Sequence, residues 1–225
     1  AMSNSYGARW FDMDWQAQFD SPEWEATLTD YLDLMNNYGP PGASSNGFNE
    51  NLSLFQQGKC GMWIDATVAA SFVTDEDEST VADSVGFAQF PNKEGVDNRG
   101  NWLWSWNLAI PASSDATDAA KTFVAWATSK GYTELVAEEE GWAAAPPGTR
   151  TSLYENEAYQ EAAPFAEMTL NQINAVDTKK PSVQEIPYTG AQFVAIPEFQ
   201  GIGTAVGQQF SAALAGQTDA ATALQ

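Results

Sequence analysis

Three tryptophans at alternate positions, Trp102, Trp104 and Trp106, are the residues whose spacing points most directly to ligand chemistry. They lie in the stretch GNWLWSWNLAIP, residues 100–111. Successive side chains of a strand point to opposite faces, so in a strand the three indoles share one face. Such a face either fills a hydrophobic core or stacks against the apolar C–H face of a sugar or polyol. The spacing alone leaves both interpretations open.

Asp65 is a candidate hydrogen-bond acceptor for the same kind of ligand. It follows the apolar stretch CGMWI, residues 60–64, which is typical of a buried strand, and it precedes ATVAASFV, which favours a helix. In open α/β sheets, ligands bind outside the carboxyl ends of the strands. A carboxylate there accepts two or more hydroxyl hydrogen bonds. The alternative is an aspartate that caps the following helix, and the two roles are compatible if each uses its own oxygen.

Composition excludes several other chemistries. The 225 residues include 30 acidic and nine basic side chains and no histidine, which gives a formal charge of −21. A nucleic-acid interface needs clustered Lys and Arg, so we expect no nucleic-acid partner. Histidine-bearing catalytic triads are excluded, and Cys60 lacks the histidine base that usually activates a cysteine nucleophile. We predict no metal and no other cofactor.

The acidic residues select no catalytic or calcium site by spacing. The stretches TDEDEST and AEEEG lack the pattern of a calcium-binding loop, and we interpret them as solvated loops. Two carboxylates could hydrolyse a glycosidic bond, but no local motif selects one pair. A glycoside hydrolase fragment and a polysaccharide-binding module that exposes its tryptophans therefore remain the alternatives to small-ligand binding.

The two ends of the chain predict a segment of a longer protein. AMSNSYGARWF has neither the basic region nor the apolar core of a signal peptide, and TDAATALQ begins a helix that stops before two turns. No uninterrupted apolar run approaches the roughly 18 residues of a membrane-spanning helix. We therefore expect no direct membrane insertion.

Predicted helices and strands alternate along the chain. Ser21, Pro22 and Glu23 are a strong helix start, and a long apolar stripe predicts the last helix. This alternation favours an α/β fold built from crossover units. The predicted helices lie at 21–38, 113–131, 155–161, 164–176 and 197–215, with a further short helix that carries Leu52 and Phe55 and ends at Gly58. The predicted strands lie at 60–64, 84–90 and 102–110.

Five stretches together resemble one protein family. They are YGARWFDMDW, PPGASSNGFNENLSLFQQGKCGMWIDAT, GNWLWSWNLAIPASS, GWAAAPPGTRTSLY and PYTGAQFVAIPEFQGIGTAVGQQFSAALAG. In this order they resemble the C-terminal portion of bacterial extracellular solute-binding proteins of the sugar-binding ABC-importer class, most of all those for sorbitol or mannitol. Ala8 departs from the pattern, in which a second glycine precedes the arginine.

The resemblance implies an α/β fold, the two-lobed type II periplasmic-binding-protein clamshell. Residues 1–98 and 147–225 would form the C-terminal lobe, and residues 99–146 a returning segment of the N-terminal lobe with the hinge. The family implies a binding protein rather than an enzyme, periplasmic or extracellular, with its signal peptide upstream. It would capture a small polyol or sugar between the lobes and deliver it to the permease of an ABC transporter.

The resemblance also implies the ligand-binding residues. Asp65 would accept hydroxyl hydrogen bonds, two tryptophans would line the cleft from the hinge side, and the start of the last helix would contribute an aromatic contact. Trp106 is assigned to the core, and the remaining candidates lie on loops. The implied set is Asp65, Asn101, Trp102, Trp104, Phe199, Gln200, Arg9, Asn46, Phe48 and Arg150.

Overall fold

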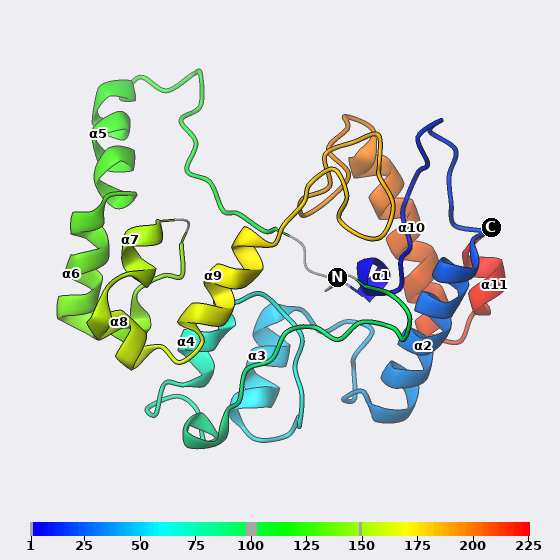
Figure 1. Ribbon diagram of the computed structural model, residues 1–225, viewed down its shortest axis with the longest axis horizontal. Helices are drawn as coiled ribbons and strands as arrows, with labels where there is room; N and C mark the ends of the chain where they lie inside the picture. Colours follow the sequence, from blue (N-terminus) through cyan, green and yellow to red (C-terminus); the bar gives the residue numbers. More distant parts are fainter. Residues whose placement is uncertain (1, 98–102, 149) are drawn as a thin grey trace.

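The computed structural model describes residues 2–97, 103–148 and 150–225, and Figure 1 shows two groups of helices on opposite sides of the molecule. Helices α2, α10 and α11 form one group, α5 to α8 form the other, and α3, α4 and α9 lie between them. The bounds are α1 Met2–Ser5, α2 Pro22–Tyr38, α3 Phe48–Gln56, α4 Ala69–Val73, α5 Thr117–Ala127, α6 Lys130–Glu140, α7 Thr151–Tyr154, α8 Glu157–Ala162, α9 Ala166–Asn174, α10 Phe199–Leu214 and α11 Ala220–Ala223, with 3-10 turns at Ala82–Ser84 and Trp142–Ala144.

The two longest helices, α2 and α10, confirm the sequence prediction because their signals are local. Ser21 caps α2 by accepting a hydrogen bond from the backbone N–H of Trp24 at 3.4 Å. The chain leaves α2 at Gly39, just before two prolines that cannot continue a helix. Beyond α10, Gly216 adopts a φ of 70°, a left-handed conformation that glycine tolerates best.

Helix α6 was not predicted as a separate element. Gly131 was expected just past the end of the preceding helix, but it lies in the first turn of α6. The reason is Ser129, whose hydroxyl accepts a hydrogen bond from the N–H of Tyr132 at 3.2 Å and starts a new helix. The stretch therefore contains two helices where one was expected.

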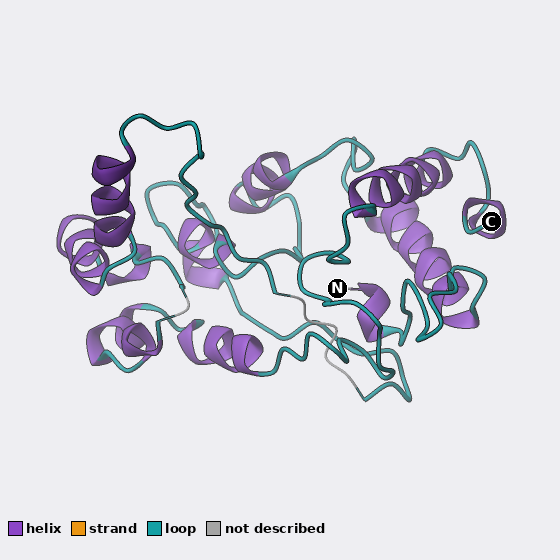
Figure 2. Ribbon diagram, turned by 90° about the horizontal axis from the view of Figure 1, so that it is seen from above, coloured by secondary structure: helices purple, strands orange, loops and turns teal. Residues whose placement is uncertain are grey.

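The predicted strands do not form among the described residues. The only pairings there are two isolated bridges, Phe11 with Ala17 and Gly190 with Val194, and Figure 2 shows the connecting segments as loops. The buried strand predicted at 60–64 is wrong in a second respect, because Met62 is 88% and Ile64 63% exposed. A strand needs a neighbour to pair its backbone, and burial needs a layer that covers it. The described part of the chain offers these segments no pairing neighbour, and at 60–64 Trp63 alone is half-buried, against Phe48 and Phe55.

Three separate hydrophobic clusters hold the helices together. The first joins α4, α7, α8 and α9 around Tyr159 and Phe165, both almost fully buried. A second packs Leu28 of α2 against α10 and α11. The third surrounds Val194 in the loop before α10. The side chains of this third cluster reach Phe199, one of the predicted ligand-binding residues.

Candidate functional site

Asp65 lies where the sequence predicted, between an extended apolar segment and a helix. Its Oδ1 accepts a hydrogen bond from the adjacent N–H of Ala66 at 2.7 Å, and the side chain is exposed. Helix α4 begins four residues later, with Val68 at its N-cap and no side-chain cap. The alternative that Asp65 caps this helix is therefore wrong. Its other oxygen is available for a ligand hydroxyl.

Asn46 and Phe48 lie next to the segment that carries Asp65. The ring of Phe48, at the start of α3, contacts Trp63 at 5.3 Å between centroids. The amide nitrogen of Asn46 and the indole nitrogen of Trp63 are both buried without a hydrogen-bond partner among the described residues. Trp63 was not predicted for this neighbourhood. Its signal is its place between Met62 and Ile64, which point to solvent while Trp63 is half-buried.

The described tryptophans of the 100–111 stretch share a face, as their spacing predicted. The rings of Trp104 and Trp106 meet edge to face at 5.5 Å. Trp104 is 45% exposed and Trp106 84% exposed, so the assignment of Trp106 to the core is wrong. Among the described residues this segment has no paired strand. Asn101 and Trp102 lie outside the described residues.

Phe199 and Gln200 form the first turn of α10, as expected. The ring of Phe199 stacks on Phe193 at 5.8 Å and meets Trp10 edge to face at 5.0 Å. Gln200 is exposed to solvent. Phe199 is thus held in an aromatic cluster, whereas Gln200 is free to turn toward a ligand.

A single side chain links the tryptophan segment to this aromatic cluster. Ser105, between Trp104 and Trp106, donates its backbone N–H to Oε1 of Gln192 at 3.2 Å. Gln192 immediately precedes Phe193, which stacks on Phe199. The structure therefore brings the neighbourhood of Trp104 close to the start of α10, although the two are far apart in sequence.

The two predicted arginines bind backbone carbonyls. Arg9 donates Nη1–H to the carbonyl of Glu185 at 3.2 Å. Arg150 donates from Nε and Nη2 to the carbonyl of Thr128, at 2.8 Å and 2.5 Å. Arg150 precedes α7, across the molecule from α10 (Figure 1), so the structure does not bring it together with Phe199.

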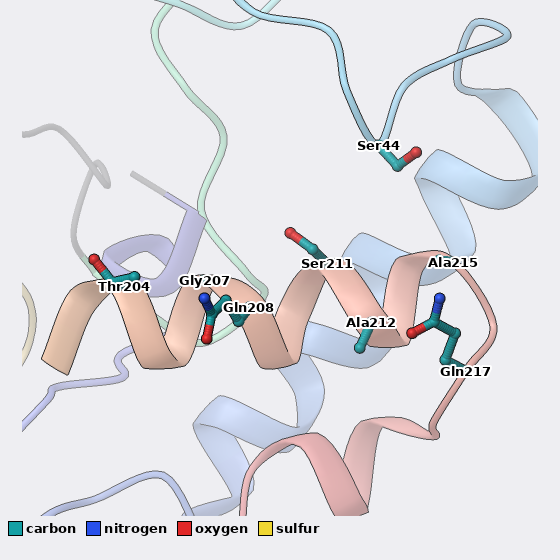
Figure 3. Close-up of a pocket in the computed structure, with 8 residues that line it drawn as sticks. All are labelled: Ser44, Thr204, Gly207, Gln208, Ser211, Ala212, Ala215 and Gln217. Atoms are coloured by element: carbon teal, nitrogen blue, oxygen red, sulfur yellow. The ribbon is translucent and has the colours of Figure 1, made fainter. Parts of the chain in front are cut away.

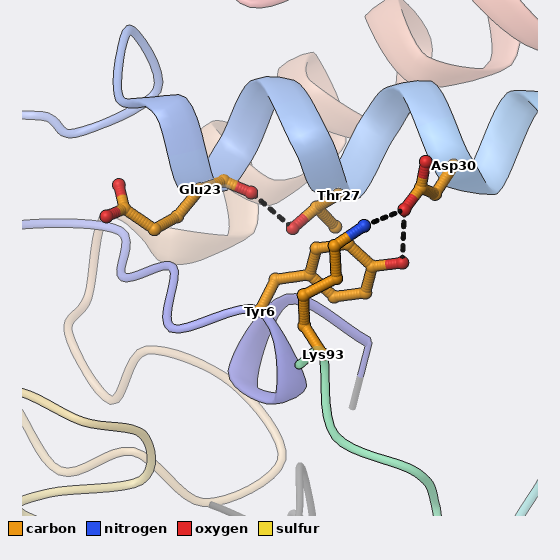
Figure 4. Close-up of polar contacts among 5 residues, drawn as sticks. All are labelled: Tyr6, Glu23, Thr27, Asp30 and Lys93. Carbon is orange, nitrogen blue, oxygen red and sulfur yellow. Dashed lines mark hydrogen bonds and ion pairs between the residues drawn. The ribbon is translucent and has the colours of Figure 1, made fainter. Parts of the chain in front are cut away.

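A polar cluster anchors the segment that leads toward the tryptophans. Oδ2 of Asp30, on α2, accepts hydrogen bonds from Oη of Tyr6 at 2.6 Å and from Nζ of Lys93 at 2.7 Å (Figure 4). The hydrogen bond from Lys93, and then that from Tyr6, lower the pKa of Asp30 below its usual value. Burial, reinforced by the Asp30 hydrogen bond, raises the pKa of Tyr6 to about 12. Lys93 thus ties the 91–97 segment to α2.

A cavity of about 570 Å³ lies along α10, and none of the predicted site residues lines it. Figure 3 shows Ser44, on a separate loop, above the helix face that carries Ser211. The volume suits a small ligand, but the lining offers neither an aromatic face nor a charged group. We therefore do not assign the polyol site to it. Its lining residues are Ser44, Thr204, Gly207, Gln208, Ser211, Ala212, Ala215 and Gln217.

Metal-binding clusters and membrane-spanning helices are both absent from the described part of the chain. Across 2–97, 103–148 and 150–225, no group of three or more His, Cys, Asp or Glu side chains could hold a metal ion. None of the helices in these ranges has the length and apolar character needed to cross a membrane.

Comparison with known proteins gives one consistent result. Residues 1–134 match the family of bacterial extracellular solute-binding proteins. A mannitol-binding protein of Pseudomonas aeruginosa is 56% identical over 223 residues, which are 99% of this chain and 51% of that protein.

Two solved structures of ABC transporter solute-binding proteins extend the comparison. One, from Agrobacterium vitis S4 with bound D-mannitol, is 70% identical with a TM-score of 0.95, over 99% of this chain and 53% of that one. The other, from Agrobacterium radiobacter K84 in complex with ribitol, is 24% identical with a TM-score of 0.80, over 99% and 52%.

These likenesses establish the fold and its extent. The chain has the fold of part of a type II periplasmic solute-binding protein, in keeping with the expected fold class, and it spans about half the length of the relatives it matches. The relatives are solute-binding proteins rather than enzymes. The family match covers more than half of the chain. The chain belongs to the bacterial extracellular solute-binding proteins.

Proposed function

We propose that this chain forms part of the substrate-binding component of an ABC importer that captures a sugar alcohol, with mannitol the first candidate. The observation that carries the proposal is the 70% identity to a mannitol-bound solute-binding protein over 99% of this chain. An importer component of this family works outside the cytoplasmic membrane and hands its ligand to a membrane permease. No bond of the ligand is made or broken.

The proposed ligand contacts use aromatic faces and a carboxylate. The exposed ring of Trp104 would stack on the C–H face of the polyol, and Phe199 would supply a second apolar wall. The free oxygen of Asp65 would accept hydroxyl hydrogen bonds. Of the other candidates, Asn46 and Gln200 could donate amide hydrogens, while Phe48 supports the Asp65 segment through Trp63. Asn101 and Trp102 complete the proposed set of ligand-binding residues.

The two arginines take a supporting role in this proposal. Arg9 holds the loop at Glu185, and Arg150 holds the turn at Thr128, through backbone carbonyls in both cases. Guanidinium groups used in this way stabilise loops that carry the site rather than contact the ligand themselves. We therefore propose that they act on loop geometry.

The proposed division of the chain remains 1–98 and 147–225 in one lobe and 99–146 in the other. Exposed apolar side chains at Trp106, Leu108 and Phe123 support the assignment of the middle segment, because they need a layer to cover them. In the proposed protein, the polyol is bound between the lobes and hinge closure encloses it.

A chimera tests the proposed function directly. This chain replaces the matching half of the Agrobacterium vitis protein, and the chimera and its parent are titrated calorimetrically with D-mannitol, sorbitol and ribitol. We expect saturable binding of at least one polyol, and no hydrolysis of a chromogenic glycoside. A chimera that unfolds cooperatively but binds none of the three, while its parent binds mannitol, overturns the proposal.

A further inference from the structure

Gln192 lies at the tip of a constrained loop between α9 and α10. The loop is closed by the bridge between Gly190 and Val194 and by a hydrogen bond from the N–H of Ala195 to the carbonyl of Thr189 at 3.2 Å. Val194 is almost completely buried, which anchors the loop in the third hydrophobic cluster. The half-buried side chain of Gln192 is therefore presented from a fixed backbone.

The hydrogen bond from Ser105 fixes the orientation of the Gln192 amide. A backbone N–H can be accepted only by the amide oxygen, so the NH₂ group must point away from Ser105. In the sequence, Ser105 lies between Trp104 and Trp106, whose rings meet at 5.5 Å. Holding its backbone therefore sets the position of Trp104 and Trp106 together.

The same loop carries the opposite aromatic wall. Phe193, the next residue, stacks on Phe199 with the two ring planes only 18° apart. One short segment thus contacts both the tryptophan segment and the start of α10. This connection links the two aromatic faces, and the tryptophan segment has no paired strand among the described residues.

We infer that Gln192 is a positioning residue, which sets the Trp104 indole relative to the Phe199 ring through its hydrogen bond to Ser105. The inference rests on the proposed polyol function and deepens it, because it names a residue that shapes the site without contacting the ligand. Nothing in the local sequence marks this residue, since its partner lies 87 positions away.

The test uses two matched substitutions. Gln192→Met keeps the length of the side chain and removes the acceptor oxygen, whereas Gln192→Glu keeps an acceptor and removes the NH₂ group. The indole N–H resonances of Trp104 and Trp106, assigned from Trp104→Phe and Trp106→Phe, are recorded for each variant of this chain without ligand. Mannitol dissociation constants follow from titrating the same samples.

We expect Gln192→Met to shift both resonances and to weaken mannitol binding roughly 3- to 10-fold, the range for one lost hydrogen bond. The mannitol dissociation constant of Gln192→Glu should stay within about 2-fold of that of the original chain, which is a smaller change than the loss of a hydrogen bond causes. Unchanged resonances in Gln192→Met overturn the inference. So does a Gln192→Glu variant that binds as weakly as Gln192→Met, because the NH₂ group would then contact mannitol itself. If the original chain shows no measurable mannitol binding, the resonances still test the positioning role, and the chimera described above tests the proposed function.

Discussion

Trp104 and Phe199 present aromatic rings in two different states of packing. Phe199 is enclosed by Phe193 and Trp10, so its removal would leave a cavity as well as remove a ligand contact. Trp104 is 45% exposed and touches Trp106 along one edge. Binding and stability are therefore separable at Trp104 and coupled at Phe199.

Trp104→Ala is expected to weaken polyol binding more than tenfold in the chimera with the Agrobacterium vitis half. The loss of a stacking face costs on the order of 1–3 kcal/mol. The melting temperature should change little because the ring is half exposed. Calorimetric titration and thermal unfolding measure the two effects. Phe199→Ala is the matched control and is expected to lose both polyol affinity and thermal stability. An unchanged dissociation constant in Trp104→Ala contradicts the stacking role.

Asp65→Asn is expected to change the preference among mannitol, sorbitol and ribitol more than Asp65→Ala does. Asparagine keeps the shape but converts an acceptor oxygen into a donor, which mispairs with a hydroxyl held as a donor. Stability should change by less than about 0.5 kcal/mol in both variants, because Asp65 is exposed and caps no helix. Competition titrations give the ranking, and wild-type selectivity in both variants would remove Asp65 from the site.

At the scale of elements, helices were predictable and strands were not, for a physical reason. The caps of α2 and the stop after α10 depend on residues within one turn, so a single sequence contains their signals. A strand depends on a distant partner, and the segments at 60–64, 84–90 and 103–110 have none among the described residues. Their side-chain alternation was read correctly at Trp104 and Trp106, but burial could not follow from it.

The candidate site divides in the same way. Of its expected members, Asp65 and Trp104 were singled out by their residue types and spacing, while Asn46, Phe48 and Phe199 came from the family resemblance. Their roles as ligand contacts stay predictions. Trp63 and Gln192 were missed, because their importance comes from contacts with α3 and with Ser105 that no local pattern reveals. Arg150 was expected near the others and instead supports Thr128.

The cluster that joins α2 to the 91–97 segment predicts a pH-dependent contribution to stability. Asp30 has a lowered pKa, so its contribution is present above its ordinary value of 3.8 and is lost as the pH falls through the folded-state pKa. The pKa of Tyr6 is raised to about 12, so Tyr6 acts at the opposite end of the pH scale. Its contribution to stability is lost as the pH rises through that value.

Asp30→Asn is therefore expected to destabilise the chain near neutral pH by roughly 0.5–1 kcal/mol. The figure is small because Lys93 and Asp30 are 46% and 39% exposed, so solvent screens the pair. The difference from the original chain should shrink as the pH falls below 3.8, because the folded-state pKa of Asp30 lies below that ordinary value. Urea unfolding across this range measures it. A difference that stays constant with pH would mean that packing, not charge, explains the loss.

At the scale of the whole molecule, two opposing features govern how the isolated chain behaves. The formal charge of −21 makes copies repel one another at long range. Against this, large apolar side chains lie exposed on segments that have no strand partner in the described part of the chain, with Met62 88% and Trp106 84% exposed. Salt screens the repulsion and leaves the apolar attraction intact, so ionic strength decides which one wins.

The isolated chain is accordingly expected to be monomeric at low salt and to self-associate as salt rises. At about 0.01 M the Debye length is roughly 30 Å, and at 1 M it is about 3 Å.

The chain should also bind mannitol only weakly, at roughly millimolar and about −4 kcal/mol, because a ligand held by part of a cleft remains largely in water. Light scattering across the salt series and calorimetric titration measure the two effects on one preparation. The double substitution Met62→Ser with Trp106→Ser should suppress association without changing the charge that drives repulsion. A monomer at every salt concentration, binding mannitol at micromolar or tighter, would mean that the exposed apolar segments need no partner and that the chain completes its own site.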